Sequence, residues 1–409
     1  MRMKFNKPGQ LVLVSAASLL VAGLMTACSS LTVDFVFVTS SKAAGQNNYG
    51  EVDVFEVNSE SGAMRQIPTS PFPSGGRNPV AEAASSDNTN LYVVNHDDNS
   101  IVQFIIGNDG KLYPQNTVNT PGIYPMAVAV SGKNLFVVDT YQPLPICSTA
   151  NPCSGSVAVY PITPSSSSPP SDVLGTPLTN GNLNYWPLAL PGKPNDVIVP
   201  TAINVLGSGG EVFVTAYDSS VSPSVGYVFA FTNSSGVLSP VNGGSPFSAG
   251  ILPSAITSDS TGQYVYVTDS TSSNVLAYTV QSGLLTPLRG SPFPSGNQPS
   301  GITVDPGGSY AFVSNALDST ITVYTVSNGT LTRTSATYPT GLQPVAIGID
   351  PSKKRFLYTA NYLGGTISGF DLNSTNDSNN PLFNSQGSPY ASNAQPTAIA
   401  AIPHGSQTK

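Results

Sequence analysis

Side chains able to transfer a proton are rare in this 409-residue chain, which has 9% charged residues and two histidines. His96 is followed directly by Asp97 and Asp98, and a carboxylate beside an imidazole can orient the ring as a general base. We therefore treat His96 as a candidate catalytic residue and Asp97 as a candidate ligand-binding residue. The alternative is that these side chains only decorate a polar loop. The other histidine, His404, lies in a C-terminal tail of residues 404–409 that we expect to be disordered.

Glu82 is a second candidate catalytic residue, because it interrupts an apolar pattern. It ends the short segment that begins at Pro79, and six similar segments along the chain carry Val or Ile in its place. A carboxylate left unpaired among packed apolar side chains is costly, so Glu82 should find a partner, reach water or carry a raised pKa. Arg77 in the preceding loop is a candidate partner and a candidate ligand-binding residue. The alternative is a tolerated polar side chain without function.

Two aromatic residues are further candidates for ligand binding. Trp186 lies in a long insert at residues 180–195, and Tyr362 directly follows the strand-like segment that ends at Asn361. Binding residues often stand on long loops held by a rigid scaffold.

The elements that must position these residues recur along the chain. An apolar segment of the type Leu91 to Asn95 occurs seven times, ending at residues 40, 95, 139, 216, 269, 315 and 361. A segment of the type Pro79 to Glu82 also occurs seven times, beginning at residues 79, 125, 200, 253, 299, 344 and 396. Repetition at this spacing, with about four short strands per unit, predicts an all-β chain folded as a seven-bladed β-propeller of four-stranded antiparallel blades.

The order of the two segments predicts how the ring closes. The repeated part starts with a segment of the Leu91 type and ends with one of the Pro79 type, so we expect the C-terminal strand to join the N-terminal blade. We place the propeller at residues 33–403 and expect it to be a monomer. The long inserts then gather on one face, around the mouth of a central channel.

These units resemble a known family. The run Tyr266-Val267-Thr268-Asp269, with an Asp after the first strand and a Gly turn before the second, is similar to the units of YVTN-repeat propellers and of the related lactonase family, which includes bacterial 6-phosphogluconolactonases. The resemblance implies the propeller fold and, by analogy alone, hydrolysis of a sugar lactone or a related lactone.

Two functions remain open at this point. Our main expectation is a binding or interaction protein that presents its long-loop face and channel mouth to an unknown protein, peptide or glycan. The alternative is a lactonase. The phosphorylated sugar lactone itself is disfavoured, because it is a cytoplasmic compound and this sequence predicts export.

Metal, cofactor and nucleic-acid chemistry find little support. The sequence has no Gly-x-Ser-x-Gly, no His-Glu-x-x-His, no zinc-spaced cysteine pairs and no phosphate-binding loop, so we expect no cofactor. The net charge of -7 argues against a nucleic-acid partner.

The N-terminus predicts export and a lipid anchor. Basic residues precede an apolar run from Leu11 to Leu24, and Met25-Thr26-Ala27-Cys28 follows, which resembles a bacterial lipobox. We expect a lipoprotein signal peptide at residues 1–27, a lipidated Cys28 opening a short tether at residues 28–32, and attachment to a membrane of the cell envelope. The alternative is an ordinary cleaved signal peptide.

The two remaining cysteines, Cys147 and Cys153, flank a polar loop. Disulfides persist in exported proteins, so we expect these cysteines to pair. Two free thiols are the alternative.

Overall fold

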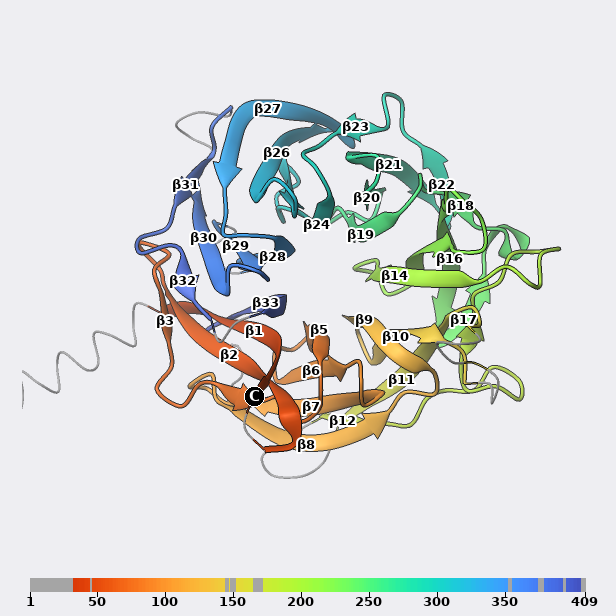
Figure 1. The fold of residues 1–409 in the computed structure, drawn as a ribbon, viewed down its shortest axis with the longest axis horizontal. Coiled ribbons are helices and arrows are strands. Elements are labelled where there is room, and N and C mark those ends of the chain that lie inside the picture. Colours follow the sequence, from red (N-terminus) through yellow and green to blue (C-terminus); the bar gives the residue numbers. More distant parts are fainter. Residues whose placement is uncertain are drawn as a thin grey trace, which may run out of the picture.

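A computed structural model of the chain describes residues 32–44, 46–143, 147, 152–164, 172–351, 355–373, 379–392 and 395–405. The described strands form seven antiparallel sheets, or blades, arranged in a ring (Figure 1). This confirms the all-β class and the seven-bladed propeller. The expected lipidation site Cys28 and the signal peptide lie outside the described residues.

Each blade has four main strands, which are given below in order from the ring axis outward. Five blades carry one further two-residue strand, which is given last and pairs with the third main strand. Blade 1 contains β33 (Pro396–Pro403), β1 (Thr32–Ala44), β2 (Tyr49–Asn58), β3 (Met64–Gln66) and β4 (Phe72–Pro73); blade 2 contains β5 (Pro79–Ala84), β6 (Asn90–Asn95), β7 (Ser100–Ile106) and β8 (Leu112–Asn119); blade 3 contains β9 (Ile123–Ser131), β10 (Asn134–Tyr141), β11 (Ser156–Pro164), β12 (Asp172–Leu174) and β13 (Trp186–Pro187); blade 4 contains β14 (Ile198–Val205), β15 (Glu211–Asp218), β16 (Val225–Ser234), β17 (Val237–Pro240) and β18 (Phe247–Ser248).

The remaining three blades follow the same plan. Blade 5 contains β19 (Pro253–Ser258), β20 (Tyr264–Asp269), β21 (Asn274–Gln281), β22 (Leu284–Pro287) and β23 (Phe293–Pro294); blade 6 contains β24 (Pro299–Val304), β25 (Tyr310–Asn315), β26 (Thr320–Ser327) and β27 (Thr330–Pro339); blade 7 contains β28 (Pro344–Ile349), β29 (Phe356–Asn361), β30 (Thr366–Leu372), β31 (Leu382–Asn384) and β32 (Tyr390–Ala391). Two short 3-10 turns, η1 (Gln46–Asn48) and η2 (Asn242–Gly244), complete the described elements.

The ring closes as the sequence predicts. Strand β33 pairs antiparallel with β1 in blade 1, with Ile399 opposite Val38. His404, the first residue of the expected tail, is held against the ring, and residues 406–409 lie outside the described residues. Its backbone N–H donates to the Val33 carbonyl, and its imidazole ring lies 5.2 Å from the ring of Phe35.

The hydrophobic core is divided among the seven junctions between neighbouring blades. Side chains alternate along a second strand, so Leu91 and Val93 of β6 pack toward blade 1, whereas Tyr92 and Val94 pack toward blade 3. Both faces of each second strand are therefore covered, and β6 is buried along its whole length. This explains why the second strands are continuous apolar runs rather than alternating ones.

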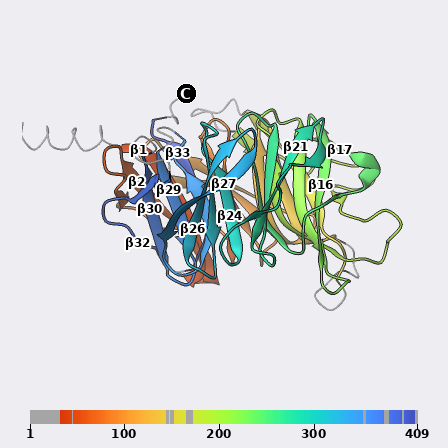
Figure 2. The same ribbon diagram turned by 90° about the horizontal axis from the view of Figure 1, so that it is seen from above.

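The blades span two faces of the ring, seen edge-on in Figure 2. We call the face where second strands end and innermost strands begin the loop face, and the opposite one the turn face. On the loop face, Asp269 at the end of β20 accepts hydrogen bonds from the backbone N–H groups of Ile251 and Leu252 and from the Ser272 hydroxyl, at 2.6 to 3.1 Å. The polar residue at the end of this second strand is thus a turn cap, as its position predicts.

The innermost strands border a channel along the ring axis. Alanines such as Ala127, Ala255 and Ala346 on β9, β19 and β28 are partly exposed, although they lie in the middle of the molecule. Water therefore reaches the axis, and the loop face contains one mouth of this channel.

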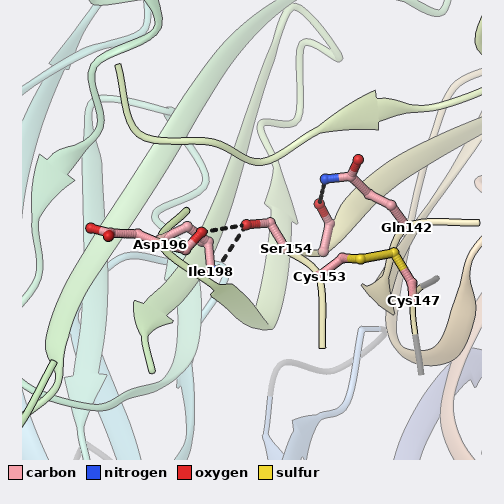
Figure 3. Close-up of a disulfide and its surroundings, with 7 residues drawn as sticks. Gln142, Cys147, Cys153, Ser154, Asp196 and Ile198 are labelled. Carbon is pink, nitrogen blue, oxygen red and sulfur yellow. Dashed lines mark hydrogen bonds between the residues drawn. A yellow bond between two sulfur atoms is a disulfide. The ribbon is translucent and has the colours of Figure 1, made fainter. Parts of the chain in front are cut away.

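The expected disulfide joins Cys147 and Cys153, whose Cα atoms are 5.3 Å apart (Figure 3). The adjacent Ser154 ties the loop to blade 4, because its hydroxyl donates to the Asp196 carbonyl at 3.0 Å and accepts from the Ile198 N–H at 3.1 Å. The stapled loop leaves β10 at Tyr141, on the loop face.

Candidate functional site

His96 lies at the channel mouth on the loop face of blade 2. It is the first residue after β6, and its backbone N–H donates to the carbonyl of Asn78, the residue before β5, at 3.0 Å. The imidazole Nδ1 lies 2.6 Å from Oδ1 of Asp97. With Nδ1 protonated, this contact leaves Nε2 with a free lone pair, which is the state that a general base requires.

Asp97 is held in its ionised form. Its Oδ1 also accepts a hydrogen bond from the Asn78 side-chain amide at 3.1 Å. Burial acts to raise the pKa of Asp97, but the hydrogen bonds from His96 and Asn78 and the nearby charge of Arg77 outweigh it and hold this pKa below its usual value. A fixed carboxylate on Nδ1 orients the ring and stabilises the imidazolium that forms when Nε2 takes a proton.

Arg77 belongs to the same cluster, but its partner differs from the expected one. Its Nε and Nη2 both lie 2.6 Å from Oδ1 of Asp98, and its backbone N–H donates to Oδ2 of Asp98 at 2.7 Å. The predicted pairing of Arg77 with Glu82 is therefore wrong, because the two side chains leave the chain at different depths. The Nη1 group of Arg77 makes no hydrogen bond to the described residues and is free to donate to a ligand.

Tyr124 is a site residue that the sequence reasoning missed. Its ring stacks on the imidazole of His96 with 4.6 Å between centroids and 8° between planes, and Tyr141 meets it edge-on at 6.1 Å. Tyr124 has a φ of 59°, and its N–H donates to Oδ1 of Asn99 at 2.7 Å. A signal was present, because Tyr124 precedes the proline of an innermost strand, where four of the six other units carry Asn or Gln and none carries an aromatic residue.

A surface groove of about 470 Å³ lies beside this cluster, between blades 2 and 3. Its lining includes Asp98, Asn99, Ile123 and Pro143. The cluster of Arg77, His96, Asp97 and Tyr124 therefore stands between the channel mouth and an open groove, where a small molecule can reach it. We call these four residues the mouth cluster.

Glu82 is not part of the mouth cluster. It lies four residues beyond Asn78 on β5, about 13 Å down the channel at ~3.3 Å per residue. Its Oε2 accepts a hydrogen bond from the Thr39 hydroxyl of blade 1 at 2.5 Å, whereas Oε1 is buried without a hydrogen-bond partner among the described residues. Burial raises the pKa of Glu82 to about 7, although the Thr39 hydroxyl and nearby backbone amides act to lower it.

The two aromatic candidates are placed differently. Trp186 in β13 is only 3% exposed, packs in the core between blades 3 and 4, and donates its indole N–H to the Leu238 carbonyl at 2.8 Å. It is therefore a packing residue and has no surface to offer a ligand. Tyr362 is partly exposed on the loop face of blade 7, where its N–H donates to the Gln343 carbonyl at 2.8 Å.

No group of three or more His, Cys, Asp or Glu residues in the described part of the chain is placed to hold a metal ion. Within the same ranges, no helix has the length and apolar character needed to span a membrane.

Comparison with protein families identifies the fold's relatives. Residues 46–143 and 295–398 match the family described as "Lactonase, 7-bladed beta-propeller". The chain belongs to this lactonase family. The matched segments contain the whole mouth cluster and Tyr362, whereas Trp186 and the disulfide lie outside them.

Solved structures share the fold of this lactonase-family propeller. A candidate 6-phosphogluconolactonase from Bacteroides uniformis is 18% identical, with 91% of this chain and 100% of that chain covered and a TM-score of 0.68. The periplasmic gluconolactonase PpgL of Pseudomonas aeruginosa is 17% identical, with 91% and 99% covered and a TM-score of 0.67. No curated protein sequence matches the chain. The family match favours the lactonase alternative over the binding module that we expected first.

Proposed function

We propose that this protein hydrolyses a lactone at the channel mouth, with His96 as the general base. The observation that carries the proposal is the mouth cluster itself, in which a His–Asp pair is stacked on Tyr124 beside Arg77 in a lactonase-family propeller. Each of these groups has a defined part in ester hydrolysis.

The first step is attack by water on the lactone carbonyl. Nε2 of His96 takes a proton from the water while its oxygen bonds to the carbonyl carbon, which gives a tetrahedral oxyanion. Asp97 stabilises the resulting imidazolium through Nδ1–H, and the face of Tyr124 stabilises it through its π electrons. The free Nη1 group of Arg77 lies in the same cluster and can donate to the oxyanion.

The second step opens the ring. The bond between the carbonyl carbon and the ring oxygen breaks, and the protonated Nε2 of His96 returns its proton to that oxygen. The product is a hydroxy acid, which releases its carboxyl proton to water at neutral pH. The cycle consumes one water, and no other co-reactant is needed.

The direct test is acid release by the purified chain at constant pH, with δ-gluconolactone and γ-butyrolactone as substrates. His96→Gln should lower kcat/KM by about 10²- to 10⁴-fold, the usual contribution of a general base. His404→Gln is the matched control, because it removes the other histidine, which packs against Phe35 at the turn face. Wild-type turnover no faster than buffer, or equal turnover by His96→Gln, would refute the proposal.

We also propose that the protein is an exported lipoprotein anchored through Cys28. The first described strand begins at Thr32 on the turn face, only four residues after Cys28. Four residues span at most about 14 Å, so an acylated Cys28 would keep the turn face near the membrane and direct the mouth cluster away from it. Metabolic labelling with a fatty acid should mark the wild type but not Cys28→Ala, and unlabelled wild type would contradict the anchor.

A further inference from the structure

Three leucines of the loop face are largely exposed. Leu317, Leu342 and Leu363 expose 66%, 62% and 67% of their surface, which are the highest values among the large apolar residues that the structure describes. Single exposed leucines are common on protein surfaces, but several on adjoining segments indicate a binding surface. We call these three residues the leucine arc.

The three leucines occupy places in blades 6 and 7 that Arg77 and Asp97 of the mouth cluster occupy in blade 2. Pro79 pairs with Asn95 in blade 2, and Pro344 pairs with Asn361 in blade 7. Leu342 therefore corresponds to Arg77, two residues before the proline, and Leu363 corresponds to Asp97, two residues after the asparagine. Equivalent places in a propeller lie at the same height and the same distance from the axis, so both groups border the mouth.

Hydrogen bonds join the segments of the leucine arc into one surface. The Gly364 N–H donates to the Leu342 carbonyl at 3.0 Å, which brings the loops of Leu342 and Leu363 together. The Gln343 N–H lies 3.3 Å from the Ser319 hydroxyl, and the Thr340 N–H donates to the Ser319 carbonyl at 2.9 Å. These contacts tie the loop of Leu317 to the segment that leads into β28. Only blade 1 separates blade 7 from blade 2 around the ring (Figure 1).

The charges at the mouth give no excess of cations for a phosphate. Arg77 is neutralised by Asp98, and Asp97 stands beside it. Lys42, two residues after the end-of-strand position in blade 1, is exposed at the rim, but Asp318 in blade 6 adds a further carboxylate. A phosphorylated ligand would meet three carboxylates and two cations here, whereas a neutral ligand would meet no such repulsion.

We infer that the ligand of this mouth is a neutral lactone carrying an apolar alkyl or acyl chain, with its ring at the mouth cluster and its chain on the leucine arc. The position that the inference gives to the lactone ring rests on the proposed function. The position of the ligand's alkyl or acyl chain rests separately on the exposed leucines and on their continuity with the mouth.

The test is a series of γ-lactones with no, ethyl, butyl and hexyl substituents. Full burial of one CH₂ corresponds to about fourfold in affinity, and a chain covered on one side should gain about twofold per carbon. We therefore expect kcat/KM for the hexyl lactone to exceed that of γ-butyrolactone by roughly 50-fold, and 6-phosphogluconolactone to be a poorer substrate than δ-gluconolactone. The double variant Leu342→Ser/Leu363→Ser should reduce the 50-fold ratio to below about tenfold.

The matched control is Val237→Ser/Leu284→Ser, which removes two exposed apolar side chains of β17 and β22 away from the mouth and should keep the ratio. A ratio near one, or a ratio that survives in Leu342→Ser/Leu363→Ser, would overturn the inference while the proposed function stands. If no lactone is hydrolysed, the proposed function fails, and calorimetry with cyclopentanone and 2-hexylcyclopentanone, which cannot be hydrolysed, still decides the inference. The inference is supported if 2-hexylcyclopentanone binds more tightly than cyclopentanone and if Leu342→Ser/Leu363→Ser removes this difference. Equal binding of the two ketones overturns the inference.

Discussion

Replacing Glu82 by Gln should change how the stability of the propeller depends on pH. In the folded protein the Glu82 carboxyl lies at the junction of blades 1 and 2, where its Oε1 is buried and only Thr39 donates a side-chain hydrogen bond to it. Burial raises its pKa from 4.5 to about 7. The folded state therefore retains a proton that the unfolded chain releases between these two pH values.

The sign of the effect follows from proton linkage. Between pH 4.5 and about 7 the folded state binds more protons than the unfolded state, so the free energy of unfolding falls as the pH rises. The stabilisation is complete below pH 4.5 and is lost as the pH passes through about 7. At about 1.4 kcal/mol per pH unit, ionisation of Glu82 costs the folded protein about 3 kcal/mol at pH 8. Gln keeps the shape of the side chain and cannot ionise.

A second buried carboxyl provides the control. Burial raises the pKa of Asp139 to about 7 as well, with hydrogen bonds from Thr120 and from the Gly122 N–H opposing it. The wild type should thus lose stability from both groups between pH 5 and pH 8. Glu82→Gln and Asp139→Asn should each remove one part of that loss, and because the residues lie in different blade junctions, the double variant should remove both.

Urea unfolding at half-unit steps from pH 5 to pH 8.5 measures these differences. The decisive quantity is the free energy of unfolding of Glu82→Gln minus that of the wild type. It should rise by about 3 kcal/mol across this range. A difference that stays constant with pH would show that Glu82 is ionised in the folded protein over the whole range, and the account of its burial would then be wrong.

Three further predictions concern residues placed by the structure. The Cys147–Cys153 bridge closes a loop with a sequence separation of 6, so Cys147→Ser/Cys153→Ser should lose about 2 kcal/mol of stability, and iodoacetamide should label these cysteines only after reduction. Trp186→Phe should lose about 1–3 kcal/mol because the Leu238 carbonyl loses its donor, with lactone turnover unchanged; a drop in kcat/KM at equal folded fraction would contradict its packing role. Tyr362→Ala should raise KM for the hexyl lactone by about threefold to tenfold at constant kcat, since it removes ground-state binding beside Leu363, and an unchanged KM would exclude Tyr362 from the ligand surface.

The ring itself could be predicted from the sequence because its determinants are local and repeated. The continuous apolar run from Leu91 to Asn95 indicates a strand that is buried on both faces. The Pro79 type of segment indicates the start of an innermost strand. The offset between the first and last segments specifies that β33 closes blade 1. None of these features requires knowledge of a contact between distant residues.

The mouth cluster could be predicted only where its members are adjacent in sequence. His96 and Asp97 are neighbours, but the stacking of Tyr124 on His96 depends on the positive φ of Tyr124 and on the offset between two blades. Arg77 pairs with Asp98 rather than Glu82 because β5 carries Glu82 down the channel while Arg77 stays in the loop. Trp186 lies in a long insert, yet the insert folds back as β13 against β11 and buries its indole.

The contrast between Glu82 and the mouth cluster shows how a departure from the repeated pattern should be interpreted in this fold. Glu82 breaks the pattern within a strand, where neighbouring blades cover much of the side chain, and its expected consequence is a loss of stability as the pH rises from 4.5 to about 7. Arg77, Asp97, Leu342 and Leu363 vary at places that no neighbouring blade covers, where each blade can differ without disturbing the core. Substitutions at these loop-face places should therefore change which lactone is bound, whereas substitutions at the place of Glu82 should change how much of the protein is folded.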